Sequence, residues 1–181
     1  TLLTSGDYAY MLRDSRARVL VASDALLDKL LPAAKDQPQL KHIVVSGAEG
    51  HGHQRLADLM DKASGSLAAA ATTADDVAFW LYSSGSTGRP KGTVHSHANP
   101  YWTAELYGKR LLGITEQDVC FSAAKLFFAY GLGNALTFPM SVGATTILMA
   151  ERPTPDATFA RWLGKVGGVK PTVFFGAPTG F

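Results

Sequence analysis

The chain has 181 residues, of which 46% are apolar and 18% are charged, and this balance indicates a globular protein with a substantial core. Its formal net charge is +2 and its basic residues are scattered, which argues against a surface that tracks nucleic acid or an anionic membrane. We therefore expect a small molecule carrying phosphate as the anionic partner.

The first part of the chain alternates apolar strand patterns with helical patterns. We expect a helix over residues 8–14, strands over 19–22 and 43–45, and between them a helix that ends at Pro32. The apolar face of that second helix is built from Leu26, Leu27, Leu30 and Leu31. This order of elements is typical of βαβ units.

Residues 49–74 change in composition, and we interpret part of them as a variable connection without chemistry. His51 and His53 lie in this stretch with no third ligand nearby in the sequence. We expect solvated loop histidines here and no metal site.

Residues 78–82 are expected to form a strand that leads into a loop, and residues 93–95 a strand that leaves it. The loop gathers three glycines, Arg89 and Lys91, and the hydroxyls of Ser83, Ser84, Ser86 and Thr87. Glycines let backbone N–H groups converge on oxyanions, so this composition favours a phosphate cradle. A Walker loop is excluded, because Lys91 follows a proline and precedes a β-favouring stretch rather than a helix.

After this loop, Asn99 and Pro100 have the residue types of an N-cap and a first helical position. The helix they predict carries an ion pair between Glu105 and Lys109, and its other face holds Ala104, Tyr107 and Leu111. For His95 and His97 we favour structural roles over catalysis, because no acid or nucleophile stands near them in the sequence.

Cys120 is the only cysteine, which excludes a disulfide within the chain, and we expect it to be a small buried side chain in a β-like run. The sequence begins without a basic, cleavable leader, so we expect a cytoplasmic protein. Residues 126–150 carry no charge, but Pro139 to Gly143 predicts a break between a buried helix and a buried strand rather than a membrane span.

The last predicted helix opens at Thr154-Pro155-Asp156, and its core stripe is Phe159, Trp162, Leu163 and Val166. It connects strands over 145–149 and 172–175, which predicts a parallel pair with a right-handed crossover. We therefore expect an α/β fold of layered, parallel-rich sheets flanked by helices, with ligands at the carboxyl ends of the strands.

Two motifs add a resemblance to a known family. Residues 82–92, YSSGSTGRPKG, resemble the phosphate loop of the adenylate-forming acyl-CoA ligase superfamily. Residues 125–134, KLFFAYGLGN, resemble the aryl-binding region of benzoate-CoA ligases and the related hydroxybenzoate-CoA ligases. Residues 99–102 and 171–174 are also similar to that subfamily, so the resemblance covers nearly the whole chain.

The resemblance implies an internal part of a large N-terminal domain, with subdomain portions at residues 1–74 and 75–181 and with the C-terminal domain outside this chain. It implies an acid-thiol ligase that activates benzoate as benzoyl-adenylate with ATP and Mg²⁺, transfers the acyl group to coenzyme A and releases AMP and pyrophosphate. Lys91 and Thr87 take the catalytic roles. The implied phosphate-binding residues are Ser83, Ser84, Gly85, Ser86, Thr87, Gly88 and Lys91. The implied aryl-acid pocket consists of Phe128, Ala129 and Tyr130.

Several alternatives stay open at this point. Periodicity alone favours plain packing for the aromatic run at 127–130, because such runs usually fill interiors. The substrate could be a hydroxybenzoate, or the chain could be a phosphate- or nucleotide-binding module without ligase activity. A non-catalytic, partly folded fragment with exposed sheet edges is a further possibility. In the ligase interpretation, we expect the 181 residues alone to be inactive.

Overall fold

The structure, a computed structural model, describes residues 3–84 and 88–177, and for Ser84 it describes the backbone only. The chain forms two compact units: Thr1–Ala71 with Tyr82–Thr93, and Thr72–Leu81 with Val94–Phe181. Helices flank parallel sheets in both units, which confirms the predicted α/β class. The predicted subdomain portions 1–74 and 75–181 stay a prediction.

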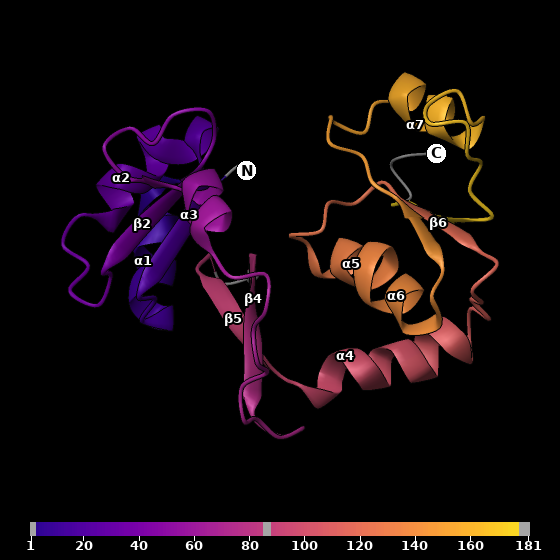
Figure 1. Cartoon of the computed structure of the whole chain (residues 1–181), viewed down its shortest axis with the longest axis horizontal. Helices are drawn as coiled ribbons and strands as arrows, with labels where there is room; N and C mark the ends of the chain where they lie inside the picture. Colours follow the sequence, from indigo (N-terminus) through magenta and orange to yellow (C-terminus); the bar gives the residue numbers. More distant parts are fainter. Residues whose placement is uncertain (1–2, 85–87, 178–181) are drawn as a thin grey trace. The chain divides into compact units, whose positions relative to one another are not determined.

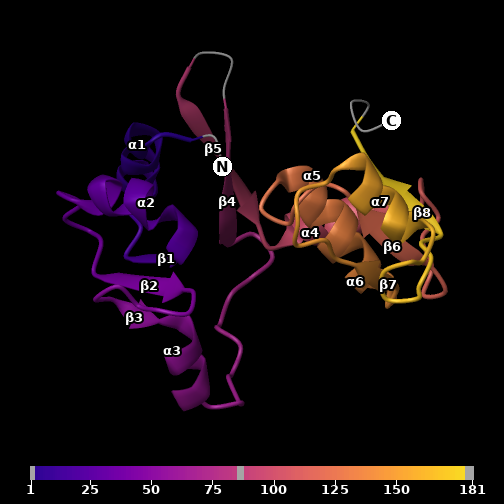
Figure 2. The same cartoon turned by 90° about the horizontal axis from the view of Figure 1, so that it is seen from above.

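The first unit (indigo to purple in Figure 1) is built on a parallel sheet of order β1-β2-β3, whose three strands are labelled in Figure 2. Its elements are α1 (Ser5–Ser15), β1 (Val19–Ser23), η1 (Asp24–Leu26), α2 (Leu27–Ala34), β2 (His42–Ser46), β3 (Gln54–Arg55) and α3 (Leu56–Lys62). Parallel pairing places Val19 opposite His42 and Ser23 opposite Ser46. The core between sheet and helices consists of Ala22, Leu27, Leu30 and Val45.

One prediction for this unit is corrected, and a second gains detail. Pro32 lies inside α2 and does not end it, because burial of Leu30 and Ala33 on either side of the proline favours continuing the helix despite the lost backbone donor. The stretch interpreted in part as a variable connection contains β3 and α3, whose short, weakly patterned sequences carry little periodic signal. His51 is exposed, as expected.

Strands β4 (Val77–Ser84) and β5 (Pro90–Ser96) form a separate two-stranded sheet (Figure 2). Each strand has residues in both units. In the second unit, Phe79 and His95 stack with ring centroids 5.0 Å apart. This contact is consistent with a structural role for His95.

The second unit is built on a parallel sheet of order β7-β6-β8. Its further elements are α4 (Ala98–Thr103), η2 (Ala104–Lys109), β6 (Val119–Ser122), α5 (Ala129–Leu132), η3 (Gly133–Thr137), α6 (Phe138–Val142), β7 (Thr145–Ile147), α7 (Pro155–Trp162) and β8 (Val173–Phe175). The core is a cluster of Ala104, Ile114, Cys120, Phe138 and Phe175. Cys120 is buried as predicted.

The predicted pairing of the two strands around α7 is wrong. β7 and β8 share one sheet but each pairs with β6, which lies between them. β6 has the most completely buried sequence of the three, and Cys120 and Phe121 have no exposed surface. A strand buried on both faces belongs at the centre of a parallel sheet, so β6 takes that place.

Helix α7 begins as predicted, with the Thr154 side chain as N-cap and Pro155 in the first turn. The predicted core stripe is wrong, because Phe159 and Leu163 are 51% and 55% exposed and the helix ends at Trp162. The buried side chain is instead Arg161, which is paired with Glu151 at 2.6 Å. The helix therefore buries an ion-paired arginine that lies next to Trp162 and outside the predicted apolar stripe.

The boundaries of two other helices differ from the predictions. α4 begins at Ala98, and Asn99 lies inside it, where its Oδ1 accepts from the backbone N–H of Ser96 at 2.9 Å. Pro139 lies in the first turn of α6 and does not end the helix, whereas the predicted break between helix and strand falls at Gly143, which caps α6 with φ +77° before β7 begins at Thr145.

The Glu105–Lys109 ion pair is confirmed. Of the three residues assigned to the opposite face of that helix, only Ala104 is buried, whereas Tyr107 and Leu111 are exposed. In the part of the chain that the structure describes, no helix combines the length and the hydropathy needed to cross a bilayer.

Candidate functional site

The predicted phosphate loop connects β4 to β5, and the described residues place its two flanks. Ser83 is exposed near the end of β4, and Lys91 is exposed near the start of β5. Gly85, Ser86 and Thr87, which carry much of the predicted site, lie outside the described residues. The two strands pair, so Ser83 and Lys91 belong to the same end of one two-stranded sheet.

Gly88 has the backbone conformation that a phosphate cradle requires. Its φ is +91°, a region that residues with a Cβ rarely adopt, while a Cβ placed there would meet no atom within 4 Å. Backbone conformation, and not crowding, therefore explains the glycine. A turn of this kind lets successive N–H groups point to one side, as anion-binding loops need.

The flanks of the loop are held against helix α1 within the first unit. The Tyr82 hydroxyl donates to the Asp14 carboxylate at 2.7 Å. The Arg89 guanidinium lies over the Tyr10 ring, 5.8 Å from its centroid, in a cation–π arrangement. Burial, and then the hydrogen bond to Asp14, raise the pKa of the Tyr82 phenol. Tyr82 is therefore a neutral donor at physiological pH.

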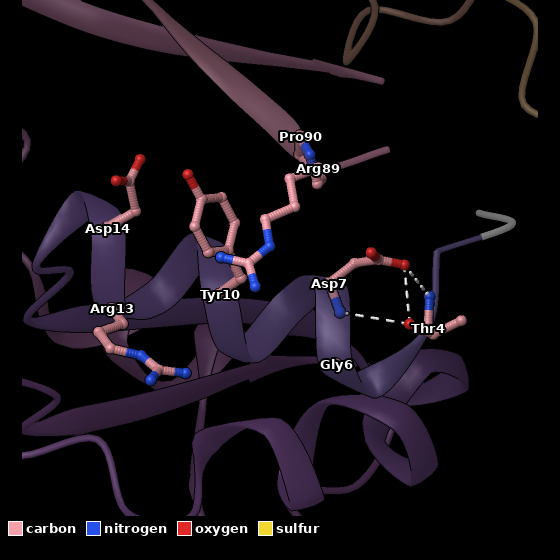
Figure 3. Close-up of a pocket in the computed structure, with 8 residues that line it drawn as sticks. All are labelled: Thr4, Gly6, Asp7, Tyr10, Arg13, Asp14, Arg89 and Pro90. Atoms are coloured by element: carbon pink, nitrogen blue, oxygen red, sulfur yellow. Dashed lines mark hydrogen bonds between the residues drawn. The ribbon is translucent and has the colours of Figure 1, made fainter. Parts of the chain in front are cut away.

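An open hollow of about 590 Å³ lies between α1 and the start of β5 (Figure 3). Its charged lining residues are Asp7, Arg13, Asp14 and Arg89. Asp7 is occupied in capping α1, where its Oδ2 accepts from the Thr4 backbone N–H at 2.8 Å, and this bond lowers the Asp7 pKa. The mixed charge and the engaged acids give the hollow no clear preference for an anion.

The predicted aryl segment lies at the carboxyl edge of the sheet in the second unit. β6 ends at Ser122, and the chain continues through Lys125 to Phe128 before α5 begins at Ala129. The next residue after β6 is tied to β8, because the Ala123 N–H donates to the Phe175 carbonyl at 3.0 Å. This is the edge at which ligands are expected in open α/β sheets.

The aromatic side chains of this segment are exposed, and they do not fill the core. Phe127, Phe128 and Tyr130 are 64%, 58% and 48% exposed. The Tyr130 hydroxyl donates to the Gly176 carbonyl at 3.4 Å, so Tyr130 reaches across to the chain that leaves β8. The plain-packing interpretation of the run is therefore not what the structure shows.

Charged residues around this segment escaped the sequence analysis. The Lys125 ammonium donates to the carbonyls of Met149 and Glu151, and the Glu151 carboxylate pairs with Arg161. Lys125 is 24 residues from Met149 and 26 residues from Glu151 in the sequence. A periodic pattern in the sequence could therefore not have revealed these two contacts. The hydrogen bond from its own backbone N–H, and then the one from Arg161, lower the pKa of the Glu151 carboxyl.

Sequence patterns also gave no indication of a role for Asn134. It is 3% exposed, and its Oδ1 has no hydrogen-bond partner among the described residues. It stands in η3, a π-helical segment, and such segments are frequent at functional sites. Among residues 3–84 and 88–177, no group of three or more His, Cys, Asp or Glu side chains is arranged to hold a metal ion.

A family profile described as "AMP-binding enzyme" matches residues 1–181. Among curated proteins, a benzoate–CoA ligase of Thauera aromatica is 56% identical over 99% of this chain and 33% of its own length. A 4-hydroxybenzoate–CoA/benzoate–CoA ligase of Rhodopseudomonas palustris is 48% identical over 99% of this chain and 32% of its own length. The chain thus spans about a third of each relative.

Solved structures agree with these matches. A benzoate CoA ligase from Burkholderia xenovorans LB400 has a TM-score of 0.85 at 56% identity, covering 99% of this chain and 34% of that one. The anthranilate CoA ligase AuaEII, solved in complex with anthranoyl-AMP, has a TM-score of 0.89 at 37% identity with the same coverage.

Proposed function

Because the chain belongs to the AMP-binding enzyme family, we propose that the whole protein is an ATP-dependent aryl-acid CoA ligase acting on benzoate. It activates the carboxylate as benzoyl-adenylate with loss of pyrophosphate, then passes the acyl group to the thiol of coenzyme A with release of AMP. One observation carries the proposal: 56% identity across 99% of this chain to a protein named as a benzoate–CoA ligase.

The phosphate loop supplies the electrostatic part of the first step. As the carboxylate attacks the α-phosphorus, the bond to the bridging oxygen breaks and negative charge accumulates on pyrophosphate. We assign Lys91 and the backbone around Gly88 to stabilising that charge, and the exposure of Lys91 on β5 and the positive φ of Gly88 support this assignment. Thr87 and Ser83 through Ser86 add hydroxyl and amide donors in the same proposal.

Mg²⁺ belongs to this proposal as a partner of the ATP phosphates. Its expected ligands are phosphate oxygens together with the hydroxyls of the loop, since this ion usually keeps few protein ligands and binds with the nucleotide. When bound, the ion neutralises charge on the phosphates.

The aryl acid is assigned to the segment around Phe128, Ala129 and Tyr130. The exposed rings of Phe128 and Tyr130 flank a small residue, an arrangement that suits a flat ring. The position of this segment at the carboxyl edge of β6 and β8 supports the assignment. The name of the Rhodopseudomonas palustris relative favours 4-hydroxybenzoate as the second candidate.

The test is pyrophosphate release by the full-length protein with ATP, coenzyme A and a panel of aryl acids. We expect release that depends on benzoate, followed by benzoyl-CoA formation. Release that is faster with 4-hydroxybenzoate would favour the second candidate. Liberation of inorganic phosphate without any need for an aryl acid would instead point to a nucleotide-binding module of another class.

A further inference from the structure

We propose that Lys125 is a positioning residue for the aryl-acid segment, which it holds to the chain that leaves β7. The inference rests on the proposed function, because it assigns Lys125 a role in orienting Phe128 and Tyr130 toward an aryl carboxylate. Lys125 itself needs no contact with the substrate in this role.

Lys125 binds a pair of backbone carbonyls that lie far from it in the sequence. Its ammonium donates to the backbone oxygens of Met149 and Glu151. Met149 is 6% exposed and stands just beyond the end of β7, so one of the two carbonyls that the ammonium binds belongs to a buried residue. A lysine with two carbonyl partners far away in sequence is unlike a solvated surface lysine.

The anchor joins segments that leave two neighbouring strands. Lys125 follows β6, the Met149–Glu151 stretch follows β7, and these strands pair in parallel from Val119 opposite Thr145 to Phe121 opposite Ile147. The ammonium therefore ties together two connections at the same carboxyl edge of the sheet. The β6–β7 ladder ends at Phe121 opposite Ile147, so Lys125 continues the connection between these two segments beyond the ladder.

The anchor is braced from helix α7. The Glu151 carboxylate pairs with Arg161 at 2.6 Å, and Arg161 also donates to the Ala157 carbonyl at 3.1 Å. The Arg161 side chain is only 8% exposed, whereas that of Glu151 is 52% exposed. The buried guanidinium of Arg161 makes both of these contacts and so holds Glu151, at the end of the 149–151 stretch. Lys125 therefore binds a stretch that has a second attachment of its own.

The aryl segment has little freedom between Lys125 and the start of α5. The Phe128 N–H donates to the Lys125 carbonyl at 3.0 Å. A Cβ on Gly131 would stand 2.0 Å from that same carbonyl, so the turn closes on Lys125. Displacement of Lys125 is therefore transmitted to Phe128 and Tyr130, which are the two rings assigned to the substrate.

The experiment compares full-length wild-type protein with Lys125→Met, which keeps an unbranched side chain one atom shorter and removes the donors. Steady-state pyrophosphate release is measured at varied benzoate and at varied ATP. We expect the KM for benzoate to rise by roughly tenfold or more, while the KM for ATP changes less than about twofold. Lys109→Met is the matched control, because that lysine belongs to a local i, i+4 pair on η2.

Lys125→Gln provides a second variant with fewer donors but retained polarity, and partial recovery of the benzoate KM is expected. Should Lys125→Met fail to fold, the benzoate-to-ATP KM comparison on Lys125→Gln decides the matter. Equal changes in both KM values, or no change in a folded variant, would overturn the positioning role. Failure of the wild-type protein to release pyrophosphate with any aryl acid would instead refute the proposed function, so the two outcomes are distinct.

Discussion

The Tyr82 hydroxyl donates a 2.7 Å hydrogen bond to the Asp14 carboxylate and so joins the strand that enters the phosphate loop to a helix 68 residues earlier in the sequence. This contact and the Arg89–Tyr10 cation–π pair attach both flanks of the loop to α1. Both contacts hold the described strands on either side of the proposed phosphate loop.

Substitution of Tyr82→Phe should lower the stability of the first unit by about 1 kcal/mol, because one hydrogen bond to a charged acceptor at a partly exposed position is lost. The KM for ATP should rise with it if the bond orients the loop. Asp14→Asn, which keeps an acceptor oxygen, is expected to have the smaller effect, and Asp14→Ala should match Tyr82→Phe. Chemical unfolding and pyrophosphate release check both points.

Lys91→Ala in the full-length enzyme should slow adenylation by about 10²- to 10³-fold, the usual effect of removing one preorganised donor from developing charge. The measurement is single-turnover formation of the aryl-adenylate. Lys41→Ala removes an exposed lysine of the same unit whose ammonium bonds locally to Pro38 and serves as the control. An unchanged adenylation rate in Lys91→Ala would remove Lys91 from the proposed catalytic group.

Cys120 should be unreactive in the native protein. Burial first, and the nearby Asp118 charge second, raise the pKa of its thiol from 9.0 to about 11. The neutral thiol therefore prevails at neutral pH, and reaction with a disulfide reagent at pH 8 should require unfolding. Since the folded pKa is the higher one, the linked stabilisation is full below pH 9.0 and declines as pH rises toward 11. Rapid labelling under native conditions would contradict this.

Asp118 stands just before β6 and is bonded to Thr172, which stands just before β8. Its Oδ2 accepts from the Thr115 N–H at 2.8 Å, and its Oδ1 accepts from the Thr172 hydroxyl at 2.7 Å. The Thr115 backbone bond, followed by the two threonine hydroxyls, lowers the Asp118 pKa below its usual 3.8. The resulting stabilisation is present above pH 3.8 and is lost as pH falls through the lower folded value. Asp118→Asn should therefore show a smaller loss of Tm on acidification than the wild-type protein.

Local patterns predicted much of the fold. Apolar runs located β1, β2, β6 and β8, and the Thr154-Pro155 pair located the start of α7, because these features act within a few residues of the chain. Local sequence patterns gave wrong predictions where contacts with residues far away in the sequence decided which side chains are buried. α2 continues through Pro32 because Ala33 is buried, and Arg161, not an apolar neighbour, is the buried residue of α7 because Glu151 meets it.

The sequence by itself determined the family, the phosphate-loop motif and the lone buried thiol, because each depends on residue types at fixed short spacings. Only the tertiary structure decided that β6 lies between β7 and β8, that the aromatic run at 127–130 is exposed, and that Lys125 binds carbonyls beyond β7. Those outcomes come from contacts between segments far apart in the chain. Such contacts form when the chain closes long loops and buries apolar surface between distant segments. The spacing of neighbouring residues in the sequence does not encode them.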